Sequence, residues 1–69
     1  MVEVFKTNVQ HEHDAVVILE QLSRRYPMHR INFDLDDCDK ILRLEGTAVC
    51  PETVTDLLRC QGHHCEVLQ

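Results

Sequence analysis

The sequence predicts an α+β fold in which four antiparallel strands form one sheet and two helices cover one of its faces. Segments in which apolar and polar residues alternate indicate the strands, and two segments with apolar residues three and four positions apart indicate the helices. The order of these segments along the chain supplies the topology. With 69 residues the chain makes a single domain, 1–69, and has no room for a second core.

The first half of the chain reads as strand, helix and strand. Residues 2–9 favour a strand with two competing registers, in which either Phe5, Thr7 and Val9 or Val2 and Val4 face the core. Residues 12–26 favour a helix with acidic residues in the first turn, arginines in the last turn and a proline directly after it. Its core stripe is Ala15, Ile18, Leu19, Leu22 and Tyr26. Residues 29–36 alternate strictly and predict the second strand.

After a turn, the second half repeats the pattern of strand, helix and strand. Residues 36–39 predict a polar turn, and residues 40–45 predict a third strand that Gly46 ends. Pro51 fits the first turn of a second helix, and Gly62 suits the left-handed position after its last turn. Residues 65–68 give a last short strand. The order is therefore β-α-β-β-α-β, and two right-handed β-α-β units in this order give the ferredoxin-like arrangement.

Three loops should meet at one end of this fold, because consecutive elements alternate in direction. The first strand-helix loop carries His11, His13 and Asp14, and the last helix-strand loop carries His63 and His64. The hairpin between the second and third strands carries an acidic run. That run lacks the ligand spacing and the glycine of a calcium loop, so it is interpreted as a solvated turn. Its acidic residues are Asp34, Asp36, Asp37 and Asp39.

Composition argues against several classes of function. The net charge is -5, and no basic cluster exceeds the Arg24-Arg25 pair, so we expect no nucleic-acid partner. No apolar run approaches the ~20 residues of a membrane span, and the N-terminus lacks a signal-peptide pattern, so we expect no membrane insertion and a cytoplasmic location. The chain has no nucleophile elbow, no phosphate-binding glycine loop and little room for a substrate pocket. We therefore do not expect an enzyme.

The four cysteines are Cys38, Cys50, Cys60 and Cys65. They form no Cys-x-x-Cys pair, and the chain shows no export signal. We therefore expect reduced thiols, most of which act as small apolar fillers. The sequence leaves open whether Cys38, Cys60 or Cys65 takes part in a metal site.

Three short motifs, spread over nearly all of the chain, point together to one family. Residues 5–9 (Phe-Lys-Thr-Asn-Val) resemble a strand that leads into a metal loop. Asp34-Leu35 and residues 39–42 resemble the hairpin found in bacterial members of this family. Gly62 followed by His63 resembles the family's glycine-aromatic pair before the last strand. In this order they resemble the heavy-metal-associated domain, the small module of copper chaperones and metal ATPases. The resemblance implies the ferredoxin-like fold and a role in metal binding.

The chain departs from this family at the metal loop itself. Where the family carries Cys-x-x-Cys, this sequence has His11 and Asp14. We therefore do not expect the chain to handle copper(I) in the manner of the family, because both soft thiolates are missing. Imidazole with carboxylate suits a divalent ion instead: Zn(II), Cu(II), Ni(II) or Co(II). We predict His11, Asp14 and His63 as ligands with His13 as a further donor, in a metal chaperone, buffer or sensor.

An alternative interpretation gives these residues no metal. His11 and His13 would then be solvated, and Asp14 would accept backbone N–H bonds in the first turn of the helix and interact favourably with the helix dipole. The chain would be a degenerate, metal-free domain of the same fold that acts as a protein-interaction or homodimerisation module. The surfaces available for this are the outer strands and an apolar patch on the uncovered face of the sheet. The patch comprises Val2, Val4, Ile41 and Leu68.

Overall fold

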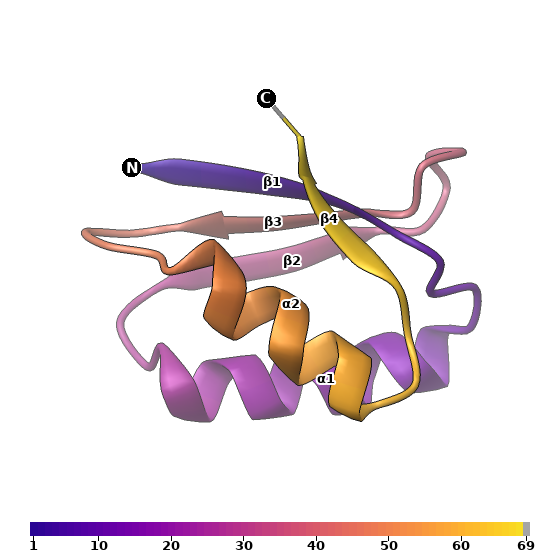
Figure 1. The fold of residues 1–69 in the computed structure, drawn as a ribbon, viewed down its shortest axis with the longest axis horizontal. Helices are drawn as coiled ribbons and strands as arrows, with labels where there is room; N and C mark the ends of the chain where they lie inside the picture. The colour runs from indigo at the N-terminus through magenta and orange to yellow at the C-terminus, as the bar shows by residue number, and fades with distance from the viewer. Residues whose placement is uncertain (69) are drawn as a thin grey trace.

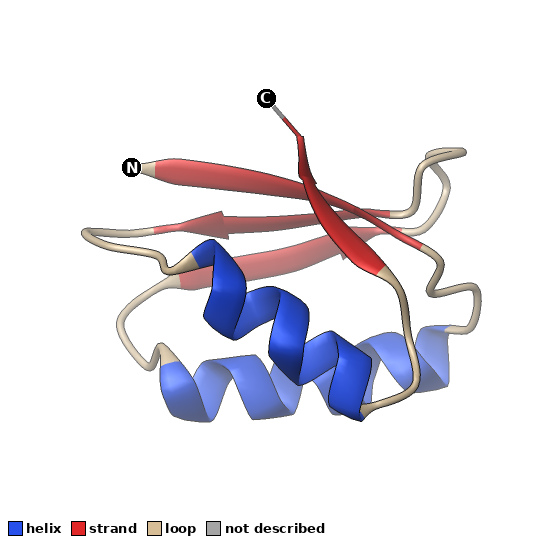
Figure 2. Cartoon of the chain, in the orientation of Figure 1, coloured by secondary structure: helices blue, strands red, loops and turns tan. Residues whose placement is uncertain are grey.

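Six elements make up the computed structural model, which describes residues 1–68. They are β1 (Val2–Thr7), α1 (Glu12–Arg25), β2 (Arg30–Asp34), β3 (Ile41–Glu45), α2 (Pro51–Cys60) and β4 (Cys65–Leu68). The strands pair antiparallel in the order β2-β3-β1-β4. Both helices lie on one face of this sheet, and the other face is uncovered (Figures 1 and 2). The predicted ferredoxin-like α+β fold is confirmed.

The register of β1 decides which side chains form the core. Phe5 pairs with Leu42 of β3 on one side and with Val67 of β4 on the other. Phe5, Thr7 and Val9 are all buried, so the first of the two predicted registers is the one adopted. Val2 and Val4 consequently point to the uncovered face. Around Phe5 the core is completed by Ala15, Ile18, Leu22, Leu42, Leu44, Val49, Val54 and Leu58.

The two helices begin and end close to the predicted positions. Arg24 and Arg25 occupy the last turn of α1, where their charge complements the helix dipole. Pro51 is the first residue of α2 and lacks an N–H that would need a partner there. Gly62 follows α2 with a φ of 84°, a left-handed conformation that glycine adopts without steric cost. The chain can therefore turn directly from α2 into β4.

The fifth histidine, His29, has a structural role at the end of the sheet remote from the other four. Its Nε2–H donates to the Ala48 carbonyl at 2.6 Å, which links the loop before β2 to the loop before α2. Its ring packs on Tyr26 at a centroid distance of 4.9 Å and lies so close to Gly46 that a methyl group there would collide with it. These contacts give His29 a packing role, while its Nδ1 is buried without a hydrogen-bond partner among the described residues.

Thr7 and Asn8, at the end of β1, join three loops. The Thr7 N–H donates to the Asp39 carbonyl at 3.1 Å, and its Oγ1–H donates to the Lys40 carbonyl at 2.6 Å. The same oxygen accepts the Val9 N–H at 3.2 Å. Asn8 and His64 make two hydrogen bonds: Asn8 N–H to the His64 carbonyl at 3.2 Å, and His64 N–H to Asn8 Oδ1 at 2.8 Å. Two residues thus tie the hairpin turn and the loop before β4 to the loop before α1.

Thr7→Val tests this junction. Thr7 is only 5% exposed. Valine keeps the shape of threonine and removes the hydroxyl, which leaves the N–H of the buried Val9 without its acceptor. We expect the free energy of unfolding to fall by about 1–3 kcal/mol, the range for a buried polar group left unpaired. Urea denaturation measures it. Thr47→Val, at an exposed loop position, is the matched control and should change stability little; equal losses would contradict the assigned role.

Candidate metal site at the loop pole

The loop pole is the end of the molecule formed by residues 8–11, residues 35–40 and residues 61–64. Its three loops come from distant parts of the chain, and the hydrogen bonds of Thr7 and Asn8 hold them together. The predicted convergence of these loops is confirmed. It places the backbone of the loop that carries His63 and His64 directly beside the start of the loop that carries His11.

The four predicted ligands have different environments at this pole. His11 is the N-cap residue of α1 and makes no capping hydrogen bond with its side chain. His11 and His13 are exposed, whereas Asp14, in the first turn of α1, is partly buried. His63 is partly buried, and its N–H donates to the Leu58 carbonyl at 2.9 Å. Exposed imidazoles can reorient at little cost; His63 has less freedom.

The structure does not gather these four side chains into a compact group. Among residues 1–68, the ligand atoms of no three of them lie within 4.8 Å of one another. His63 instead lines a shallow pocket of about 360 Å³ with Asn8, Cys65 and Arg59. The guanidinium of Arg59 lies 3.5 Å from Asp56, which partly offsets its positive charge near that pocket. The ligand assignment stays a prediction that requires side chains to turn toward a common ion.

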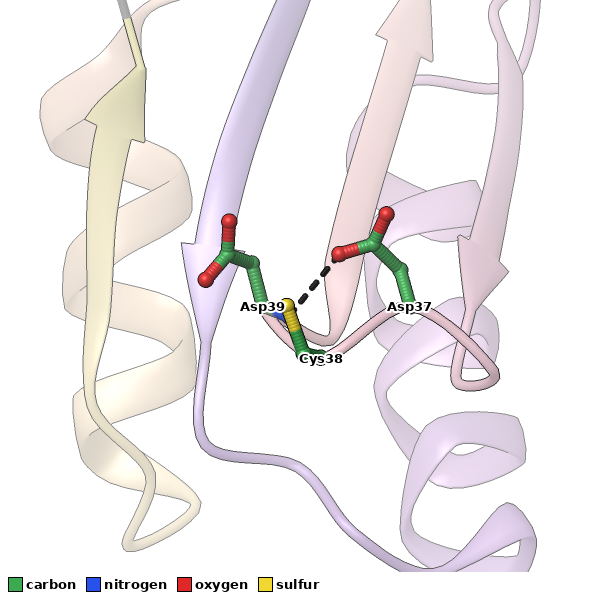
Figure 3. A group of neighbouring side chains, drawn as sticks. All are labelled: Asp37, Cys38 and Asp39. Atoms are coloured by element: carbon green, nitrogen blue, oxygen red, sulfur yellow. Dashed lines mark hydrogen bonds between the residues drawn. The ribbon is translucent and has the colours of Figure 1, made fainter.

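One compact group of ligating side chains does occur at the loop pole, in the hairpin. The ligand atoms of Asp37, Cys38 and Asp39 lie within 4.8 Å of one another (Figure 3). The turn brings them together, because Asp37 Oδ1 accepts the Asp39 N–H at 2.8 Å and the Asp37 carbonyl accepts the Lys40 N–H at 3.0 Å. Asp39 also faces Lys6 at 3.7 Å. The sequence showed the acidic run but not that the thiol points to the same side.

The prediction that most cysteines are small apolar fillers is wrong. Cys38, Cys50 and Cys60 are exposed, and only Cys65 packs against the core. All three exposed thiols lie in a turn or at a helix end, where the chain has no apolar layer to fill. Hydrogen bonds from the side chain and backbone of Thr53 to Cys50, at the N-terminus of α2, lower the pKa of that thiol. Burial raises the pKa of Cys65 to about 11.

The burial of Cys65 predicts a pH dependence of stability. In the unfolded chain the thiol ionises near its usual pKa of 9.0, whereas in the folded chain it stays protonated up to a pKa of about 11. The unfolded state therefore binds fewer protons within this window, and the free energy of unfolding should fall as pH rises through it. The measurement is the difference between the wild type and Cys65→Ala in urea denaturation, which isolates the contribution of this thiol.

Cys60→Ala is the control for this experiment, since its thiol is exposed. We expect Cys60→Ala to follow the wild-type pH profile and Cys65→Ala to lose part of the alkaline fall. Parallel profiles for all three proteins would contradict the assignment of the shift to Cys65.

The uncovered face of the sheet carries the apolar residues predicted for it, separated by charges. Val4 pairs with Arg43 on one side and with Leu68 on the other, and Val2 pairs with Glu45. Val2 is 44% exposed and Leu68 is 39% exposed. Ile41 lies next to Asp34 of β2. The predicted patch is therefore real in position but broken up by ionic side chains, unlike the continuous apolar face under the helices.

No helix in the part of the chain that the structure describes is long and apolar enough to cross a membrane. Comparison with protein-family models, with curated proteins and with solved structures finds no match in any of the three.

Proposed function

We propose that this protein is a small module that binds a divalent transition metal at the loop pole, as a chaperone, buffer or sensor. His11, Asp14 and His63 are the proposed ligands, and His13 is the further donor. The observation that carries the proposal is the double hydrogen bond between Asn8 and His64, which holds the two histidine-bearing loops against each other. The resemblance of residues 5–9 and 62–63 to the heavy-metal-associated domain supports the same location.

The donor set determines which ions fit. Neutral imidazoles and a carboxylate favour Zn(II), Cu(II), Ni(II) or Co(II) over Cu(I), which prefers thiolates. His11 and His13 are exposed, so binding would spend side-chain entropy on ordering them around the ion. A moderate affinity follows, which suits transfer or sensing better than permanent storage.

Zinc-dependent thermal stability tests the proposal. Zn(II) at a hundredfold excess over its Kd should stabilise the folded state by about 2.7 kcal/mol, seen as a rise in melting temperature. His11→Ala and His63→Ala should each abolish most of the rise. His64→Ala is the matched control: His64 lies beside His63, its side chain is exposed, and its Nε2 lies 3.9 Å from Glu66. No response to any divalent ion would sink the proposal.

The pH dependence of the same response identifies histidine ligands. Protonated imidazole cannot bind a metal, so the zinc-induced rise should shrink as the pH is lowered from neutral into the acidic range and protons compete with zinc for the rings. A rise that stays undiminished in acidic solution would point to carboxylate ligands instead. The measurement is a set of melting curves with and without zinc across this range.

The hairpin group provides a rival site that the same assay distinguishes. Asp37→Asn combined with Asp39→Asn removes both negative charges and keeps the side-chain oxygen that caps the turn. If this variant loses the zinc response while His11→Ala keeps it, the ligands are those of the hairpin, and the assignment to the histidines is wrong. Cys38→Ser then reports whether the thiolate participates.

The second candidate function is a metal-free interaction module. The observation that favours it is the number of apolar side chains left exposed around the sheet, including Val2, Leu68 and, beside β2, Val16 of α1. An assembly that forms equally well in the presence of EDTA would support it. A chain that stays monomeric and is stabilised by metal would contradict it.

A further inference from the structure

We propose that two copies of this chain form a symmetric dimer by pairing their β2 strands edge to edge, which extends the sheet across both molecules. The inference rests on the second candidate function and names its partner as a second copy. It does not depend on metal. The surface consists of the free edge of β2 and the adjoining groove between β2 and α1.

The outer edge of β2 has backbone groups directed away from the sheet. The Gly46 N–H donates to the Met1 carbonyl at 2.9 Å, so Leu44 and Leu42, two and four residues back along β3, direct their backbone groups toward β1. The backbone N–H and C=O groups of Arg43, which lies between them, point toward β2, where Arg43 pairs with Asn32. By the same alternation, Ile31 and Phe33 present their N–H and C=O groups to the free edge. Another strand can pair there without disturbing the monomer.

The sequence of β2 is complementary to itself when the strand is reversed. Its residues are Arg30-Ile31-Asn32-Phe33-Asp34. In antiparallel pairing centred on Asn32, Ile31 opposes Phe33 of the second copy and exchanges backbone hydrogen bonds with it. Arg30 opposes Asp34 of the second copy, and the pair occurs twice by symmetry. These charged residues fall at non-hydrogen-bonded positions, where opposing side chains lie closest.

Other pairings of the same kind fit less well. A two-fold axis perpendicular to the extended sheet keeps each side chain on its own face of the sheet. Opposing side chains must also share a face, so the axis must pass between one residue and the same residue of the second copy. Within β2 only the register centred on Asn32 pairs all five residues. The other outer strand, β4, offers a centre at Glu66, which would set two glutamates against each other, or at Val67, which would leave Cys65 without an opposite residue inside the strand. Charge complementarity therefore selects β2.

The side chains next to this edge supply an apolar contact on the helix side of the sheet. Phe33 and Leu35 line a groove of about 580 Å³ with Ala15, Val16 and Leu19 of α1. The rest of its lining is polar and comprises Gln10, Glu12, Asn32, Asp34 and Asp36. Val16 is 48% exposed although it is a branched apolar residue. In the paired arrangement the two grooves lie on either side of the two-fold axis, on the same face of the extended sheet. Their apolar walls would be withdrawn from water together with Ile31 and Phe33.

Charge reversal within β2 tests this dimer. The molecular mass in solution is measured by sedimentation equilibrium across a range of concentrations, both with and without EDTA. Arg30→Asp and Asp34→Arg each place like charges opposite each other twice, and each should raise the dimer dissociation constant about tenfold. The double variant Arg30→Asp/Asp34→Arg restores both ion pairs with the signs exchanged and should recover dimerisation.

Two controls show whether a weakened dimer reflects the loss of this interface. Arg43→Asp changes a charge on the same sheet face but on the inner strand β3, and should leave the dimer intact. Far-ultraviolet circular dichroism and melting temperature show whether each variant stays folded. A dimer that survives both single reversals overturns the β2 interface while leaving an interaction module standing. A chain that is monomeric at all concentrations overturns both, and a dimer lost in EDTA shows a metal bridge and also overturns the β2 interface.

Discussion

The hydrogen bonds at Thr7 and Asn8 are the constraint on which the arrangement of this small molecule most depends. The end of a central strand would otherwise leave polar backbone groups beside the core. Here the Thr7 hydroxyl both accepts the Val9 N–H and donates to the Lys40 carbonyl. Lys40 has a φ of 48°, a left-handed conformation that costs energy for a residue with a Cβ. Its hydrogen bonds to the turn and to Thr7 offset that cost.

These hydrogen bonds bring three loops together, but they do not by themselves bring the proposed ligand side chains together. Backbone hydrogen bonds fix where residues 8–11, 35–40 and 61–64 run, and the core holds Val9 beneath them. They do not fix the orientation of the exposed side chains of His11 and His13. A metal site built on such a frame would be assembled by the ion from free side chains, whereas the hairpin group of Asp37, Cys38 and Asp39 is already close together through its own turn.

The free edges of the sheet raise a second physical question, because an unpaired strand is a template for assembly. Natural proteins commonly place charges on edge strands to prevent pairing. The charges on β2 have opposite signs at symmetric positions. Charged residues that prevent pairing on many edge strands would therefore attract an antiparallel second copy of β2. The short length of β2 limits the interface, and the groove beside α1 adds the apolar area that backbone pairing alone lacks.

The sequence by itself determined the element order, the fold class and most of the core, because these follow from periodicity and from local signals such as Pro51 and Gly62. It also located the loop pole, since alternating strand directions leave no other place for those loops. It left the register of β1 open, because both faces of that strand carry apolar residues and only pairing with β3 and β4 separates them. It misjudged three cysteines, whose exposure depends on where the helix ends and turns lie rather than on residue type. Three features follow only from the tertiary structure. They are the approach of the Cys38 thiol to two carboxylates, the packing of His29 on Gly46, and the outward direction of the Ile31 and Phe33 backbone groups. Each of these depends on angles and neighbours far apart in the chain, which no local pattern encodes.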